Sequence, residues 1–142
     1  MLLGTHTSAD APNYLQIAEF SIPDLKPDPA DYDDDREEIG GYGAGKKPQS
    51  EVKFDIIQKI DHDGEINKAR YMPQNPNMIA TMCVDGRVLV FDRTKHPLQP
   101  TGIVNPQIEL RGHEKEGFGL HWNPRREGQL VTGSEDGTVR LW

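Results

Sequence analysis

The sequence predicts an all-β fold assembled from repeated sheets, and an internal repeat is the main reason. Residues 62–91 align without a gap on residues 113–142. Each copy begins with a histidine, places an Asp-Gly pair between two strand-like runs and ends on an aromatic residue. Repeats of roughly 40–50 residues with this layout are typical of the four-stranded blades of β-propellers. We therefore expect a β-propeller. The identical pairs are His62/His113, Glu65/Glu116, Pro73/Pro124, Thr81/Thr132, Asp85/Asp136, Gly86/Gly137 and Val88/Val139.

The first 60 residues predict a partial blade that carries an insertion. Residues 2–7, 14–22 and 52–60 have strand character. Between the last two, residues 28–38 hold seven carboxylates in eleven positions. Such a segment cannot bury enough apolar surface to offset the entropy lost on ordering. We therefore expect residues 23–50 to be a mobile surface insertion.

Residues 61–111 predict one whole blade. An inner strand is expected at 66–71, and strands at 78–84 and 87–92 should pair across the Asp-Gly turn, which is the strongest short-range hairpin signal in the chain. A proline-containing polar loop then leads to an outermost strand at 107–111.

Residues 112–142 predict a second repeat that is truncated after its third strand. The chain as given should thus be an N-terminal fragment of about two to three blades, whereas propellers usually have about four to eight. Blades bury their faces against neighbouring blades. On its own, this chain is expected to be poorly stable and to melt over a broad range.

Composition excludes several classes of protein. The net charge of −7 argues against direct binding to nucleic acid and favours basic partners. A single cysteine, Cys83, rules out an internal disulfide and suits a reducing compartment; it has no metal-ligand neighbour at zinc-like spacing. No apolar run approaches the ~20 residues that span a bilayer, and the N-terminus lacks the features of a signal peptide.

Four residues of the second repeat predict a hydrogen-bonded relay inside a blade: His113, Thr132, Asp136 and Trp142. The aspartate would accept from the histidine, the histidine would meet the threonine hydroxyl, and this hydroxyl would meet the indole N–H. Such a relay satisfies buried polar groups and fixes the shape of a blade. Histidine, aspartate and a hydroxyl also make catalytic triads. Here their spacing recurs with the repeat, which favours the structural interpretation.

The first repeat has an incomplete version of this relay. His62, Thr81 and Asp85 occupy the equivalent positions, but Phe91 replaces the tryptophan and has no N–H to donate.

Two motifs resemble ligand sites without matching them. Residues 40–47 nearly spell a phosphate-binding loop, but Lys47 stands where a Ser or Thr must hold magnesium. The alternating aspartates of residues 31–35 begin like a calcium loop, yet Arg36 and Tyr42 occupy the positions that need Gly and Glu. We expect no metal and no cofactor.

Glu65 and Glu116 are the candidates for a binding site. They follow the histidine and precede the inner strand in consecutive repeats, so neighbouring blades would present two carboxylates at one end of the central channel. Asn67 and Phe118 are equivalent to each other, two residues further on. Acids, an amide and an aromatic ring suit a Lys or Arg side chain. The alternative is that each glutamate caps a turn or is simply solvated.

Several uncommon strings resemble one family. The strings are LLGTHTS (2–8), EIGGYG (38–43), DHDGEINKARYMPQNP (61–76), VLVFDRTKHP (88–97), LRGHEKEGFGL (110–120) and SEDGTVRLW (134–142). They closely resemble the retinoblastoma-binding-protein-like WD40 histone chaperones and, among these, the fungal regulatory subunits of type B histone acetyltransferase.

The resemblance implies a seven-bladed WD40 propeller and a site for the histone H3 tail on its channel face. Matched motif by motif, this site comprises His6, Glu65, Asn67, Glu116 and Phe118. Animal relatives usually carry tyrosine at the last position, so a phenolic hydrogen bond would be missing here while stacking remains. The family's histone H4 site lies outside these residues.

The resemblance also implies a role. The chain would be a non-catalytic subunit that binds histones H3 and H4 and presents new H4 to a separate catalytic acetyltransferase subunit, in the nucleus and cytoplasm. It would bind no nucleic acid directly and no membrane. One alternative is a sibling role in chromatin assembly, deacetylase or Polycomb complexes. Others are an enzyme in its own right, hydrolytic or nucleotide-dependent, and a WD40 adaptor with non-histone clients.

Overall fold

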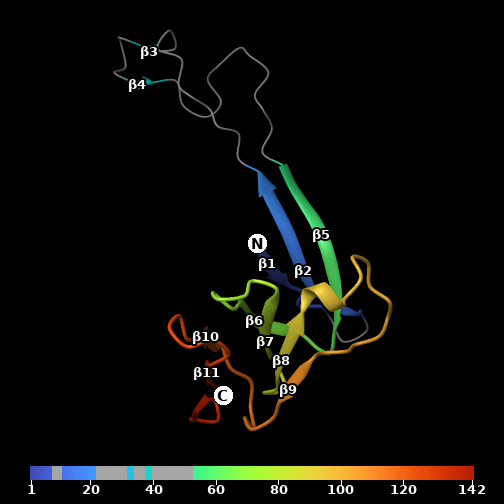
Figure 1. Cartoon of the computed structure of the whole chain (residues 1–142), viewed down its shortest axis with the longest axis vertical. Coiled ribbons are helices and arrows are strands. Elements are labelled where there is room, and N and C mark those ends of the chain that lie inside the picture. Colours follow the sequence, from blue (N-terminus) through green and yellow to red (C-terminus); the bar gives the residue numbers. More distant parts are fainter. Residues whose placement is uncertain (8–10, 22–31, 34–37, 40–52) are drawn as a thin grey trace. The chain divides into compact units, whose positions relative to one another are not determined.

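The structure is a computed structural model of the chain, and it describes residues 1–7, 11–21, 32–33, 38–39 and 53–142 (Figure 1). The regular elements among them are β-strands in antiparallel sheets and one short 3-10 helix. This confirms the predicted all-β class. The glycine-rich motif at 40–47 and most of the acidic segment lie outside the described residues.

Two compact units make up the chain: Met1–Ala18 with Ile56–Trp142, and Glu19–Asp55. In the second unit, β3 (Tyr32–Asp33) and β4 (Glu38–Ile39) form a two-stranded antiparallel ladder. All other contacts described below lie in the first unit.

The first sheet has the strand order β1-β2-β5. It comprises β1 (Leu2–Gly4), β2 (Asn13–Ser21) and β5 (Lys53–His62). Strand β1 runs antiparallel to β2, with Leu3 opposite Gln16. Strands β2 and β5 match the predicted strands at 14–22 and 52–60 closely, whereas β1 is shorter than the predicted strand at 2–7 and ends at Gly4.

The second sheet is a complete four-stranded meander in the order β6-β7-β8-β9. Its strands are β6 (Ile66–Tyr71), β7 (Met78–Cys83), β8 (Val88–Asp92) and β9 (Ile108–Leu110), all antiparallel to their neighbours. The 3-10 helix η2 (Arg93–Lys95) follows β8. The third sheet has three strands in the order β10-β11-β12, namely β10 (Gly119–Trp122), β11 (Leu130–Gly133) and β12 (Val139–Leu141).

Both Asp-Gly hairpins have the same construction. Gly86 and Gly137 have positive φ angles of 87° and 80°, which only glycine adopts without strain. The N–H of Cys83 donates to the carbonyl of Arg87, and that of Ser134 donates to Thr138, so each loop contains three residues. The aspartate in each loop accepts from the N–H two positions later. This hydrogen bond fixes the position of the aspartate carboxylate within the hairpin.

The middle sheet is buried on both faces. One face of β7 and β8 packs with residues of the first sheet, such as Leu15 and Ile60, around the fully buried Phe91. The other face packs Met82 against Trp122 and other residues of the third sheet. Each such buried side chain stabilises the fold by about 1.5–3 kcal/mol. Neighbouring sheets are therefore held face to face, as in a propeller.

Polar side chains of β5 hold the loop between β8 and β9. The buried carboxylate of Asp61 accepts from the N–H groups of Thr101 (2.7 Å) and Gly102 (3.0 Å). Gln58 donates to carbonyl groups at the start of the same loop. The loop was predicted to be polar, but it also exposes Leu98 and Ile103.

Candidate functional site

Glu65 and Glu116 lie at the same end of neighbouring sheets. Glu65 directly precedes β6, and its carbonyl accepts from the N–H of Val84 in the β7–β8 hairpin (3.4 Å). The carbonyl of Glu116 accepts from the N–H of Glu135 in the β11–β12 hairpin (2.9 Å). Each glutamate is thus held by its backbone beside the hairpin of its own sheet.

His6 and Asn67 connect the two carboxylates. The Asn67 Nδ2 donates to Glu116 Oε2 (2.9 Å) and to the carbonyl of Gly117 (3.3 Å). These two bonds orient the amide so that the Oδ1 of Asn67 faces His6. His6 Nε2 lies 3.3 Å from this Oδ1, and His6 Nδ1 lies 2.9 Å from Glu65 Oε2. The result is a continuous polar chain from one repeat to the next. The carboxylates are linked through an imidazole and an amide and do not touch each other.

The second oxygen of each carboxylate remains open. Among the described residues, no hydrogen bond reaches Oε1 of Glu65 or Glu116. Both side chains are half-buried, so a cationic group can approach them from solvent. Carboxylates prepositioned in this way accept charge-assisted hydrogen bonds from Lys or Arg without a large loss of side-chain entropy.

Phe118 stands next to this polar chain with 56% of its surface exposed. The preceding Gly117 is buried, and a Cβ atom there would collide with the backbone of Gly133. Glycine at this position therefore lets the chain pass close to β11. A shallow hollow lined by Phe118, Ser134 and Val139 lies beside the ring.

The structure brings the relay residues of the second repeat together. His113 Nε2 is 2.7 Å from Thr132 Oγ1, and the indole of Trp142 donates to the same hydroxyl (2.8 Å). His113 Nδ1 is 3.1 Å from Asp136 Oδ2. The hydroxyl and N–H of Thr138, together with other donors, hold the pKa of Asp136 well below its usual value. The ionised aspartate orients the imidazole inside the sheet, which suits a structural role.

The first repeat uses a different partner for its histidine. His62 Nε2 contacts Thr81 Oγ1 (2.8 Å), but Nδ1 donates to the carbonyl of Gly64 (2.9 Å) and not to Asp85. Burial, which disfavours the charged ring, lowers the pKa of His62. Burial also raises the pKa of the neighbouring Cys83 thiol to about 12, so this thiol stays protonated and unreactive.

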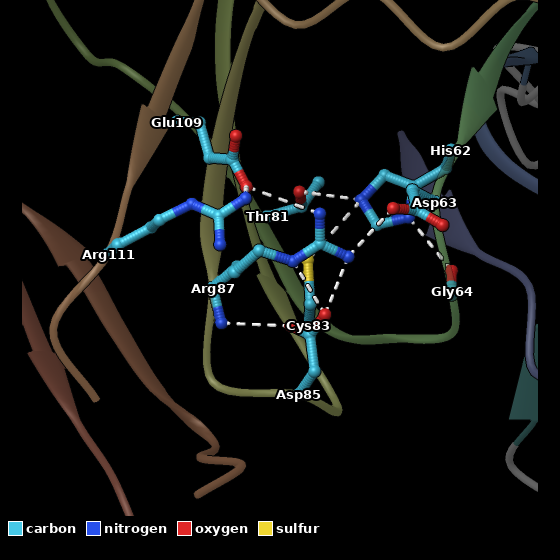
Figure 2. A network of polar contacts seen from close by, with 9 residues as sticks. All are labelled: His62, Asp63, Gly64, Thr81, Cys83, Asp85, Arg87, Glu109 and Arg111. Carbon is cyan, nitrogen blue, oxygen red and sulfur yellow. Dashed lines mark hydrogen bonds and ion pairs between the residues drawn. The ribbon is translucent and has the colours of Figure 1, made fainter. Parts of the chain in front are cut away.

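Figure 2 shows that Asp85 instead joins a network around Arg87, which the sequence did not predict. The Arg87 guanidinium contacts Asp85 (2.5 Å), Asp63 (2.8 Å) and Glu109 (3.2 Å). Arg111 adds a second contact to Glu109 (2.8 Å). Burial disfavours the charge of Arg87, but these hydrogen bonds outweigh it and raise the pKa of the guanidinium. Asp63 and Glu109 are far from Arg87 in the sequence, so they reach it only because the strands pair in this register.

In the part of the chain that the structure describes, no cluster of three or more His, Cys, Asp or Glu side chains could hold a metal ion. No described helix is long and apolar enough to cross a bilayer.

Comparison with known sequences identifies close relatives. The family description "WD domain, G-beta repeat" matches residues 104–142. The whole chain is 67% identical to the protein named Histone acetyltransferase type B subunit 2 from Aspergillus oryzae and covers 33% of it. The proteins of the same name from Aspergillus fumigatus and Neurospora crassa are 67% and 62% identical, and the chain covers 33% and 32% of them. These relatives confirm the resemblance inferred from the motifs. The chain spans about a third of the length of the curated relatives it matches.

Comparison with solved structures confirms the fold. The chain superposes on the WD40 domain from Toxoplasma gondii coronin with a TM-score of 0.64 over 99% of its residues, at 20% sequence identity. It covers 29% of that chain. This chain therefore folds as part of a WD40 β-propeller.

Proposed function

We propose that this chain, a homologue of proteins named Histone acetyltransferase type B subunit 2, is a non-catalytic, histone-binding part of that complex. It would hold histones H3 and H4 and present H4 to a separate catalytic subunit. The names of the relatives support membership of the complex, and the WD40 fold suits a scaffold.

One observation carries the histone-binding part of this proposal. Glu65 and Glu116 lie on adjacent sheets and are held by His6 and Asn67, with one oxygen of each open to solvent. A histone tail supplies Lys and Arg side chains that match this arrangement. The exposed ring of Phe118 offers a surface for the aliphatic part or the guanidinium plane of such a side chain.

The mechanism that follows is positioning. The carboxylates bind the basic H3 tail, and the bound H3–H4 unit then meets the acetyltransferase at a raised effective concentration. No covalent step falls to this chain. Because charge attraction supplies much of the affinity, binding should weaken as salt is added.

The test is the double substitution Glu65→Gln with Glu116→Gln in the full chain. It keeps the shape of both side chains and removes both charges, so we expect H3-tail affinity to fall roughly tenfold to a hundredfold. Calorimetry with an H3-tail peptide measures this change, and circular dichroism checks the fold.

A matched control is Glu114→Gln with Glu135→Gln. These carboxylates are exposed at the same end of the sheets and lie outside the polar chain, while the net charge changes by the same amount. The control should change affinity by about twofold or less. Equal affinity of the first double variant and the unmodified chain would defeat the site assignment.

Complex membership has a separate test. Affinity purification should recover an acetyltransferase catalytic subunit together with H3 and H4, and a tagged chain should appear in both nucleus and cytoplasm by microscopy. Recovery of a deacetylase or chromatin-assembly complex in its place would favour the sibling role.

A further inference from the structure

The two ends of the propeller sheets carry opposite charge. The antiparallel register fixes which loops share an end. Ile66 lies opposite Cys83, and Gly119 lies opposite Gly133, so both Asp-Gly hairpins lie at the end that holds Glu65 and Glu116. The β6–β7 turn, the β8–β9 loop and the β10–β11 turn all lie at the other end.

The end with the hairpins is acidic. The loops at this end that connect β5 to β6, β7 to β8, β9 to β10 and β11 to β12 each contain at least one carboxylate. Arg87 is already committed to two of these, Asp63 and Asp85, and to Glu109 of β9. The opposite end has the reverse balance. Its turns and strand ends carry two carboxylates, Asp92 and Glu127, and the buried Asp61 of β5 contacts the β8–β9 loop through backbone N–H groups. They also carry five basic side chains: Arg70, Arg93, Lys95, Arg125 and Arg126.

Contacts between the two sheets gather three of these arginines. The indole of Trp122 donates to the carbonyl of Arg70 (2.9 Å), and Gln74 donates to the carbonyl of Asn123 (2.9 Å). The β6–β7 and β10–β11 turns are therefore in direct contact, which brings Arg70 to the same surface as the arginines of the second turn.

The β10–β11 turn presents its arginines in a fixed backbone conformation. The Asn123 side chain accepts from the N–H groups of Arg125 (2.8 Å) and Arg126 (3.1 Å), and its amide donates to Gln129 (2.7 Å). Both arginines are exposed. Within the described part of the chain, neither they nor Arg70 form an ion pair with a carboxylate.

We propose that this basic end, centred on Arg70, Arg125 and Arg126, binds an acidic extended segment of a partner protein. Guanidinium groups bind carboxylates through paired, parallel hydrogen bonds. A short acidic peptide meets only this local charge. A nucleic acid is longer and would also experience the acidic opposite end and the net charge of −7. The propeller would thus hold a basic ligand at one end and an acidic one at the other.

The experiment uses fluorescence anisotropy with a labelled peptide of alternating glutamate and serine, about a dozen residues long, and the full chain. We expect Arg125→Gln with Arg126→Gln to weaken binding about fivefold, because two exposed Arg–carboxylate contacts are lost and each such contact is individually weak. Added salt should weaken binding by the unmodified chain and have less effect on the variant.

The matched control is Arg111→Gln with Lys115→Gln, which removes two positive charges from the opposite end. It should leave peptide affinity within about twofold. The proposal is overturned if the unmodified chain does not bind the peptide or if both double variants lose affinity equally. It is also overturned if an oligothymidylate of similar length binds more tightly and depends on the same arginines. Circular dichroism shows that the variants are folded; since the substituted side chains are exposed, no change is expected.

Discussion

In the sheet of β6–β9, His62 reaches Thr81 on one side and the carbonyl of Gly64 on the other. In the sheet of β10–β12, the equivalent His113 reaches Thr132 and the carboxylate of Asp136. Both histidines are buried and both contact a strand threonine through Nε2, so this contact is the same in the two repeats. The partner of Nδ1 differs.

The residue two positions after the hairpin aspartate accounts for the difference. In the first repeat it is Arg87, which holds Asp85 within a network that also includes Asp63 and Glu109. In the second it is Thr138. Its hydroxyl donates to Oδ1 of Asp136, and Oδ2 of the same carboxylate contacts His113 Nδ1. A repeat can therefore keep its fold while one substitution moves the aspartate from the histidine to the surface.

The largest expected contrast between the repeats comes from removing the strand hydroxyl. Thr132→Val leaves both the Trp142 N–H and His113 Nε2 without a partner, which should lower the free energy of unfolding by about 2–4 kcal/mol. Thr81→Val removes the hydroxyl partner of His62 Nε2 and leaves this atom only its weak contact with the Cys83 thiol (3.9 Å), so it should cost about 1–2 kcal/mol. Urea unfolding of the full-length protein measures both losses. Equal losses would show that the indole contact contributes nothing.

The relay in the second repeat could be predicted from the sequence because three of its four residues recur at matching positions and the fourth, Trp142, stands opposite another aromatic residue, Phe91. Each relay residue is recognisable from its counterpart or from its place in the repeat. The structure brings all four within hydrogen-bond distance: His113, Thr132, Asp136 and Trp142. The strands could be predicted for the same reason, since an Asp-Gly hairpin with flanking apolar runs is a local signal.

The rest of the polar structure depends on contacts between distant parts of the chain. Glu109 comes to Arg87 only because β9 pairs with β8, and no spacing in the sequence encodes that meeting. The two glutamates of the candidate site could be paired by repeat position. The bridge through His6 and Asn67 could not be predicted from repeat position, because His6 lies outside the repeat and was expected at the site only from the family resemblance.

A second contrast between the repeats should appear on acidification. The folded-state pKa of His62 lies below its ordinary value of 6.5, so the neutral ring contributes stability that is fully present above that pH. This contribution is lost as pH falls from 6.5 toward the folded pKa. Asp136, whose pKa is also lowered, acts in a separate window: its contribution is present above 3.8 and is lost only as pH falls further.

The variant His62→Gln isolates the first of these windows. Urea unfolding between neutral pH and the lower pKa of His62 should show a decline in stability for the unmodified chain and a smaller decline for the variant. A direct measurement is the NMR titration of the His62 ring. A midpoint above 6.5 would contradict the burial argument.

The smallest effect, and the most direct test of the comparison, is expected from Arg87→Thr, which gives the first repeat the residue of the second. Stability should change by about 1 kcal/mol or less, since the carboxylates that lose their partner are partly exposed to solvent. The pKa of His62 should rise, because a nearby positive charge is removed and Asp85 becomes free to approach the ring. NMR titration of His62 measures this rise. An unchanged or lower pKa would mean that the Gly64 carbonyl holds the ring regardless of Asp85, and the difference between the repeats would then originate in the histidine loop and not in the hairpin.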